Sequence, residues 1–121
     1  MRISAVVLAS LLIIGCGRKQ VSFHNDVLPI LDDRCAQCHG MVNPEANVVL
    51  TSYDSVMSAR VTKWKKPIVV PGKPSESWIY LRSGTTQIHF RMPPDSSRIK
   101  PLSEKEVDLL GRWILEGAKN N

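Results

Sequence analysis

Large aromatic side chains are scarce in this chain of 121 residues, which holds three tryptophans, two tyrosines and two phenylalanines. Aromatic residues supply much of the buried area of a folded core, so a core built from this set is thin. Domains of this size bury a small share of their surface and often depend on a disulfide, a metal or a bound group for stability. We therefore expect a bound group to supply part of the apolar mass.

Long hydrophobic runs are also missing. The longest one extends from Ile3 to Ile14 and follows Arg2. It is shorter than the roughly 20 residues that a membrane-spanning helix needs, but it suits the apolar region of a secretory signal. The sequence thus favours export, with an uncleaved anchor as the alternative.

The apolar run ends in Ile-Ile-Gly-Cys, which resembles a bacterial lipobox. This resemblance implies a signal peptide over residues 1–15, lipidation of Cys16 and a tether over residues 16–21. More than one acyl chain on Cys16 would anchor the protein stably. The mature protein is therefore predicted to be a membrane-anchored lipoprotein facing the periplasm or cell envelope, unless Cys16 merely follows a plain signal by chance.

Cysteine is rare, with three in the whole sequence. Exported proteins meet oxidising conditions, in which free cysteines normally pair. Lipidation of Cys16 would leave Cys35 and Cys38, which lie in one short motif. Every thiol then has a use without a disulfide.

The chain has no strong excess of charge. It carries 16 basic and 11 acidic residues, and loss of Arg2 with the signal leaves 15 minus 11, or +4. This mild excess does not indicate a nucleic-acid-binding protein. The run Lys63–Lys66, which includes Trp64, could steer an acidic partner or meet anionic lipid, and a solvated loop is the plain alternative.

The motif RCAQCHG, residues 34–40, is the main chemical signal. CxxC followed by histidine has three known uses: a zinc site, a thiol redox pair, or covalent attachment of haem. Zinc needs two further ligands, and no second close pair is present. A redox pair is expected near a strand–helix–strand pattern. Haem attachment uses Cys35 and Cys38 for the porphyrin edge and His39 for the iron, and it is the favoured interpretation.

A second ligand to the iron would have to come from elsewhere in the chain. The candidates are His24, His89, Met41, Met57 and Met92. Met57 lies in a predicted helix and is expected in the core, and Met41 is too close to His39 in sequence to reach the opposite face. Met92 precedes two prolines, which hold the chain extended and need no hydrogen bond. Met92 is therefore preferred over either histidine.

Helical periodicity predicts most of the secondary structure. Apolar spacing predicts a first helix after Ser22, with Pro29 either kinking it or marking its first ordered turn. Further helices are predicted from near Ser52 and from Ser75, with residues 62–74 as an irregular connection.

The closing segment, residues 102–118, carries the clearest helix signal, because Ser103 and Glu106 form a capping box. Its expected core stripe is Val107, Leu110, Ile114 and Ala118. Gly111 interrupts this helix, which suggests that another backbone, that of the first helix, packs closely there.

The segments FHNDVLPILDDRCAQCHG, LTSYDS, VVPGKPSESWIY, RMPP and LSEKEVDLLGRWILEGA together resemble a planctomycete-type cytochrome c domain, among the class I c-type cytochromes. This resemblance implies one domain over residues 22–121, with an all-α class I cytochrome c fold, long loops, and first and last helices crossing around one covalently bound haem c. It implies thioether links at Cys35 and Cys38, a proximal ligand at His39 and a distal ligand at Met92. The basic segment TKWKKPIVV departs from the family pattern.

The function expected from this combination is one-electron transfer in a periplasmic or cell-envelope respiratory chain, by a carrier and not an enzyme. The alternative is a haem enzyme or gas sensor whose distal ligand can leave. The expected partners are redox proteins, with the membrane reached through Cys16 and no nucleic acid. A monomer or a subunit of a larger redox complex is expected.

Overall fold

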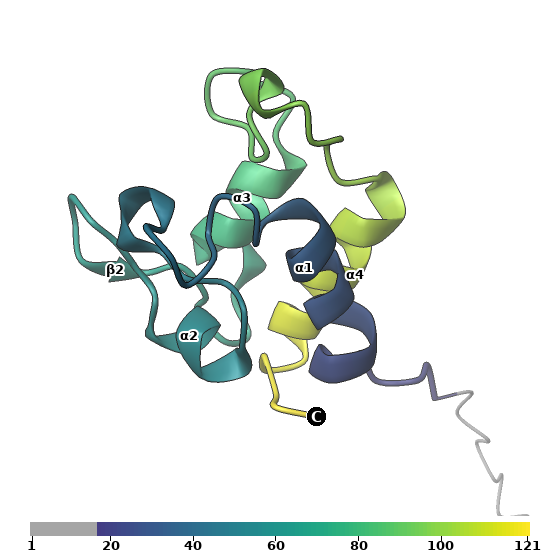
Figure 1. The fold of residues 1–121 in the computed structure, drawn as a ribbon. Coiled ribbons are helices and arrows are strands. Elements are labelled where there is room, and N and C mark those ends of the chain that lie inside the picture. The colour runs from purple at the N-terminus through teal and green to yellow at the C-terminus, as the bar shows by residue number, and fades with distance from the viewer. Residues whose placement is uncertain (1–16) are drawn as a thin grey trace, which may run out of the picture.

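The computed structural model describes residues 17–121, so the predicted signal peptide and Cys16 lie outside the described residues. The helices are η1 (Phe23–Val27), α1 (Leu28–Arg34), η2 (Glu45–Asn47), α2 (Tyr53–Ser58), η3 (Pro74–Glu76), α3 (Trp78–Gly84), η4 (Asp95–Ser97) and α4 (Glu104–Leu115), and the strands are β1 (Arg60–Val61) and β2 (Lys66–Pro67). Figure 1 shows α1 beside α4, with α2 and the strands at the opposite side. None of the helices in residues 17–121 has the length and apolar character of a membrane-crossing segment.

The N-terminal helical segment begins as predicted at Ser22. The Ser22 side chain accepts a hydrogen bond from the Asn25 N–H and so caps η1. The regular helix α1 starts only at Leu28, with Pro29 in its first turn. Proline is tolerated there because the first turn has no intrahelical partner for its nitrogen. Pro29 thus marks the start of the better-ordered half.

Helix α4 has the predicted capping box, in which the Ser103 side chain accepts from the Glu106 N–H and the Glu106 carboxylate accepts from the Ser103 N–H. Leu110, Ile114 and Ala118 are buried as expected, whereas Val107 is half-buried. The stripe also contains Trp113, which the periodicity analysis left out.

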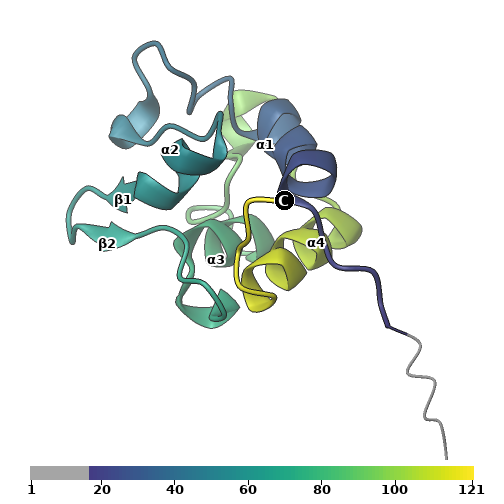
Figure 2. The ribbon, with the colours of Figure 1, turned by 90° about the horizontal axis from the view of Figure 1, so that it is seen from below.

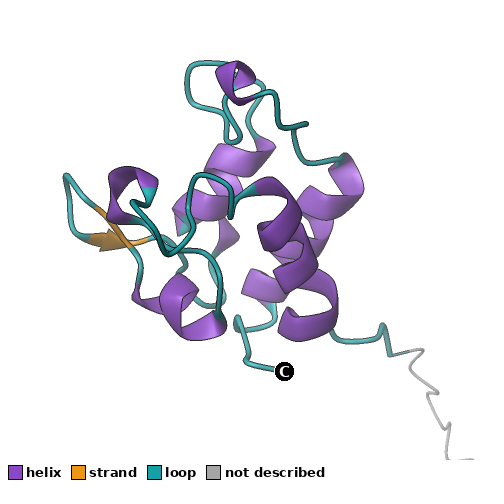
Figure 3. Cartoon of the chain, viewed as in Figure 1, coloured by secondary structure: helices purple, strands orange, loops and turns teal. Residues whose placement is uncertain are grey.

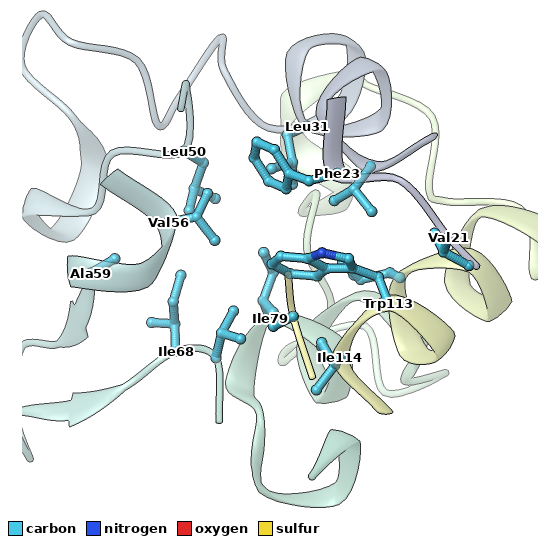
Figure 4. Close-up of a cluster of buried hydrophobic side chains, with 14 of the residues drawn as sticks. Val21, Phe23, Leu31, Leu50, Val56, Ala59, Ile68, Ile79, Trp113 and Ile114 are labelled. Atoms are coloured by element: carbon cyan, nitrogen blue, oxygen red, sulfur yellow. The ribbon is translucent and has the colours of Figure 1, made fainter. Parts of the chain in front are cut away.

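The core joins the two ends of the chain to the middle. Trp113 of α4 packs on Phe23 of η1, with ring centroids 5.3 Å apart, and Tyr53 of α2 meets Phe23 edge to face. Figure 4 shows Trp113 at the centre of this cluster, with Val56 and Ile68 approaching from the opposite side. Such aromatic contacts add to the area that each ring buries.

The sequence analysis predicted that the first helix packs closely at Gly111, and this choice of partner is wrong. A Cβ atom at Gly111 would lie 2.6 Å from Cε2 of Tyr80, which belongs to α3 and not to the first helix. The close approach is therefore real, but an aromatic ring causes it. The presence of glycine in a helix predicted the close approach without identifying the element that makes it.

The predicted helix at Ser75 begins later. Residues 74–76 form the short turn η3, and α3 begins at Trp78. The buried Ser77 hydroxyl accepts from the Val70 N–H and donates to the Lys73 carbonyl. These bonds hold the preceding loop against the start of α3, so Ser77 serves as a loop anchor.

The prediction of an all-α class I cytochrome c fold is wrong. Arg60 pairs with Pro67 and Val61 with Lys66 in an antiparallel hairpin. An irregular connection was predicted from residue 62 onward, and of the paired residues it contains Lys66 and Pro67. The four α-helices of residues 17–121 are short, and only 44% of the structure is helical. Figure 3 shows the strands and long loops between the helices. Short segments with β-branched residues form a strand pair only through tertiary pairing, which helical periodicity cannot detect.

Candidate haem site

The CxxCH motif forms an irregular turn at the end of α1. The N–H of Cys35 donates to Leu31 O at 2.9 Å, and that of His39 donates to Cys35 O at 2.8 Å. A Cβ atom on the next residue, Gly40, would lie 2.7 Å from the Ala36 carbonyl oxygen. Glycine is thus needed directly after the motif, because the chain folds back over its own preceding turn.

The His39 ring is oriented by the backbone. Its Nδ1 lies 3.1 Å from the Val48 carbonyl oxygen, and its own carbonyl accepts from the Leu50 N–H at 2.9 Å. Because a carbonyl can only accept, this geometry assigns the proton to Nδ1. Nε2 then keeps its lone pair, which is the arrangement found in metal-binding histidines.

Met92 is held by the backbone of α3. Its N–H donates to Arg82 O at 2.9 Å, and a cis peptide bond joins it to Pro93, which is buried. The hydrogen bond from Met92 to Arg82 closes the loop from residue 85 to residue 91 onto the end of α3. This closure positions the Met92 side chain, although Met92 lies 53 residues after His39.

Cys35, His39 and Met92 line one apolar cavity of about 270 Å³. This volume is close to the lower end of the range typical of ligand sites, about 300–1,000 Å³. The remaining lining residues come from four parts of the chain: Ala46, Val48, Leu50, Val61, Thr62, Trp64, Ile68, Trp78, Ile79, Arg82, Ser83 and Phe90. The fold therefore brings together three of the four residues implied by the resemblance, and the half-buried Cys38 lies on the same turn but outside the lining.

The other candidate ligands lie elsewhere. His24 contacts Asn120 at the C-terminus, with 3.0 Å between Nε2 and the amide oxygen, and His89 is exposed. Met57 packs against the core, as predicted, whereas Met41 is 82% exposed. In this structure Met92 is the candidate distal residue that shares a cavity with His39.

Four lining residues that the sequence analysis did not place at the site surround the cavity opening. The Trp64 ring stacks on Trp78, with centroids 5.5 Å apart and planes 18° apart. The Arg82 guanidinium lies over the Phe90 ring at 5.8 Å. Trp64 and Phe90 are both about half exposed, so the cavity reaches the surface beside them. The basic and aromatic run at residues 63–66 was the available signal for Trp64.

The two thiols of the motif are free. Burial, together with the nearby Cys38, raises the pKa of the Cys35 thiol to about 12, although Arg34 partly opposes the change. A thiol with so high a pKa is a weak nucleophile near neutral pH, unlike the cysteines of thiol–disulfide exchange proteins. Within residues 17–121, no three His, Cys, Asp or Glu side chains converge as ligands for a metal ion.

A family model described as Planctomycete cytochrome C matches residues 35–96, slightly more than half of the chain. The chain belongs to the Planctomycete cytochrome C family. The matched segment of this planctomycete cytochrome c starts at the first motif cysteine and includes Met92, and the resemblance drawn from the sequence is thereby confirmed. No curated protein and no solved structure matches the chain significantly.

Membership of a cytochrome c family implies binding of haem c and haem-based electron transfer. The residues at the cavity suit such a group, since they combine an imidazole with a free Nε2, a thioether, a thiol and apolar walls. Imidazole and thioether are the ligand pair of electron-transferring c-type haems.

Proposed function

We propose that this planctomycete cytochrome c is a one-electron carrier with a single haem, bonded through Cys35 and Cys38 and held between His39 and Met92. The observation that carries the proposal is the common cavity of Cys35, His39 and Met92, with the imidazole oriented by Val48. When bound, the haem supplies an iron centre that changes oxidation state by one electron.

The residues of the chain would tune and protect that centre. The Val48 carbonyl holds His39 in one tautomer and makes Nε2 a better donor. The Met92 thioether is a soft ligand, which favours the reduced iron and raises the reduction potential relative to a second imidazole. Apolar walls exclude water and act in the same direction.

The choice of a carrier over an enzyme is supported by the two ligands that the chain itself offers to the iron. If His39 and Met92 both held the iron, no position would be open to a substrate. A haem enzyme or gas sensor would instead need Met92 to leave. Binding of carbon monoxide to the reduced protein separates the two functions, because a carrier binds it slowly and weakly.

The test of the ligand set is Met92→Ala, with Met41→Ala as the matched control, in protein produced in a host competent for cytochrome maturation. Met92→Ala should remove the sulfur-to-iron charge-transfer band, lower the reduction potential and admit carbon monoxide. Met41→Ala should change none of these, because Met41 is 82% exposed and outside the cavity. An unchanged band in Met92→Ala would reassign the distal ligand, and a colourless wild-type protein would refute the proposal.

We further propose that the domain is exported and anchored through lipidated Cys16, as the lipobox-like sequence indicates. Two acyl chains hold a protein stably at a membrane, whereas a protein without acyl chains has no such anchor. Cys16→Ser should therefore move the protein from the membrane fraction to the soluble fraction with an unchanged visible spectrum. Retention of Cys16→Ser in the membrane fraction would show a different anchor.

A further inference from the structure

The hairpin formed by residues 60–67 places unpaired positive charge beside the cavity. Lys63, Lys65 and Lys66 are exposed, and none of them forms an ion pair with any residue of the described range 17–121. The sequence from Ser55 to Ser75 contains no acidic residue that could neutralise them. The charge is therefore available to a partner.

Trp64 fixes the hairpin at the cavity opening. It sits between these lysines, is 51% exposed, and stacks on Trp78, which lines the cavity. The Lys63 ammonium lies 5.4 Å from the Trp64 ring centroid. The start of the hairpin turn is held separately, because the Thr62 hydroxyl donates to Ala46 O at 2.8 Å. Charge and exposed aromatic surface are thus joined to the cavity wall.

The composition of this surface matches a protein interface. A half-exposed tryptophan surrounded by cations combines an aromatic anchor with electrostatic steering of an oppositely charged partner. The exposed Phe90 and the adjacent Arg82 repeat the combination. Trp64, Arg82 and Phe90 line the same cavity, so a partner seated here would lie next to the proposed haem.

The position of the hairpin favours a protein over the anchoring membrane. In Figures 1 and 2, β1 and β2 lie at one side of the molecule, and residues 17–21 leave it at the opposite side. A tether over residues 16–21 reaches at most about 20 Å when extended. Anchored through Cys16, the domain would present the hairpin away from its own membrane.

We propose that the basic hairpin, residues 60–67, is the docking surface for a carboxylate-rich protein redox partner, with Trp64 as its aromatic anchor. This inference rests on the proposed electron-carrier function. In each encounter one electron passes between the partner and the domain, so that one is oxidised as the other is reduced, with no proton or group transferred.

The test compares two full-chain variants of equal net charge. The hairpin variant carries Lys63→Glu, Lys65→Glu and Lys66→Glu. The matched control carries Lys100→Glu, Lys105→Glu and Lys119→Glu, which are exposed and form no ion pair within residues 17–121. Both should keep the wild-type visible spectrum, which separates this test from failure of the proposed function.

The first measurement is oxidation of the reduced protein by hexacyanoferrate(III), an anion that accepts one electron and becomes hexacyanoferrate(II). At low ionic strength the hairpin variant should react about tenfold more slowly than wild type, and the control about twofold more slowly, because steering acts near the reacting site. An equal decrease in the oxidation rate of the two variants would show that net charge alone causes the effect, and it would overturn the inference.

The second measurement identifies the class of partner. A synthetic oligoglutamate peptide should shift the amide resonances of residues 60–66 in the wild type and in the control, but not in the hairpin variant. Vesicles of phosphatidylcholine, alone or mixed with equimolar phosphatidylglycerol, probe the lipid alternative. If the hairpin substitutions weaken binding only to the anionic vesicles and leave the peptide unaffected, the surface binds lipid and the inference is wrong.

Discussion

At Gly111, the edge of the Tyr80 ring occupies the space that any side chain would need. The 2.6 Å separation between an added Cβ atom and Cε2 of Tyr80 is shorter than real Cβ contacts allow. Two effects then oppose each other in Gly111→Ala. Overpacking costs about 1–3 kcal/mol, whereas alanine in a helix interior gains about 1 kcal/mol over glycine.

We expect overpacking to prevail, because both partners lie on packed helices. Gly111→Ala should lower the free energy of unfolding by about 1 kcal/mol, measured by denaturant titration. In a Tyr80→Ala background the clash is absent, so the same substitution should become stabilising. Gly17→Ala is the control, because among residues 17–121, apart from its chain neighbour, no atom lies within 4 Å of its added Cβ. Equal effects in both backgrounds would refute the Tyr80 contact.

At the scale of the element, the first turn of α4 connects to α1 through a charged side chain. Arg34 donates to the Glu106 carboxylate at 3.2 Å, and that carboxylate also accepts from the Ser103 N–H at 2.7 Å. Burial acts to raise the pKa of Glu106, but these hydrogen bonds and the Arg34 charge together lower the pKa below its usual value of 4.5. The ionised form is thus favoured in the folded state.

The lowered pKa of Glu106 determines the direction in which stability changes with pH. A carboxylate whose pKa is depressed by folding stabilises the folded state above its unfolded pKa, and the contribution disappears as the pH falls through the folded value. The thermal unfolding temperature should therefore decrease as the pH is lowered below about 4.5. Glu106→Gln should make the unfolding temperature depend less on pH in this range. Glu104→Gln is the control, since Glu104 forms no ion pair within the described residues. An unchanged pH profile in Glu106→Gln would contradict the argument.

For the whole molecule, the cavity is large relative to the core around it. At about 24 cal/mol per Å³, an unfilled volume of 270 Å³ corresponds to at most roughly 6.5 kcal/mol, and access of water reduces this figure. Small domains have a total stability of about 5–15 kcal/mol. A bound group that fills this volume therefore contributes a major share of the stability.

Loss of covalent haem attachment should accordingly destabilise the entire domain. We expect the double substitution Cys35→Ala and Cys38→Ala to lower the unfolding temperature strongly and to broaden the transition seen by circular dichroism. Cys16→Ser, which leaves the motif intact, should unfold like the wild type. A double variant as stable as the wild type would show that the core does not depend on the haem.

Features that depend on residues close together in the sequence were predictable from the sequence. The CxxCH motif, the Ser22 cap and the Ser103–Glu106 capping box each depend on residues within a few positions of one another, so one local rule is enough to find them. Family membership could be inferred for the same reason, since its matched segment holds short motifs in a fixed order.

Other features were decided by contacts between distant segments. The hairpin at residues 60–67, the Tyr80 ring against Gly111 and the stacking of Trp64 on Trp78 all depend on which surfaces meet after folding. The position of Met92 on the wall of the His39 cavity follows from a backbone bond to Arg82 in α3. Periodicity reports which side of a segment is apolar, but packing selects the partner, and so the shape of this cavity belongs to the tertiary structure.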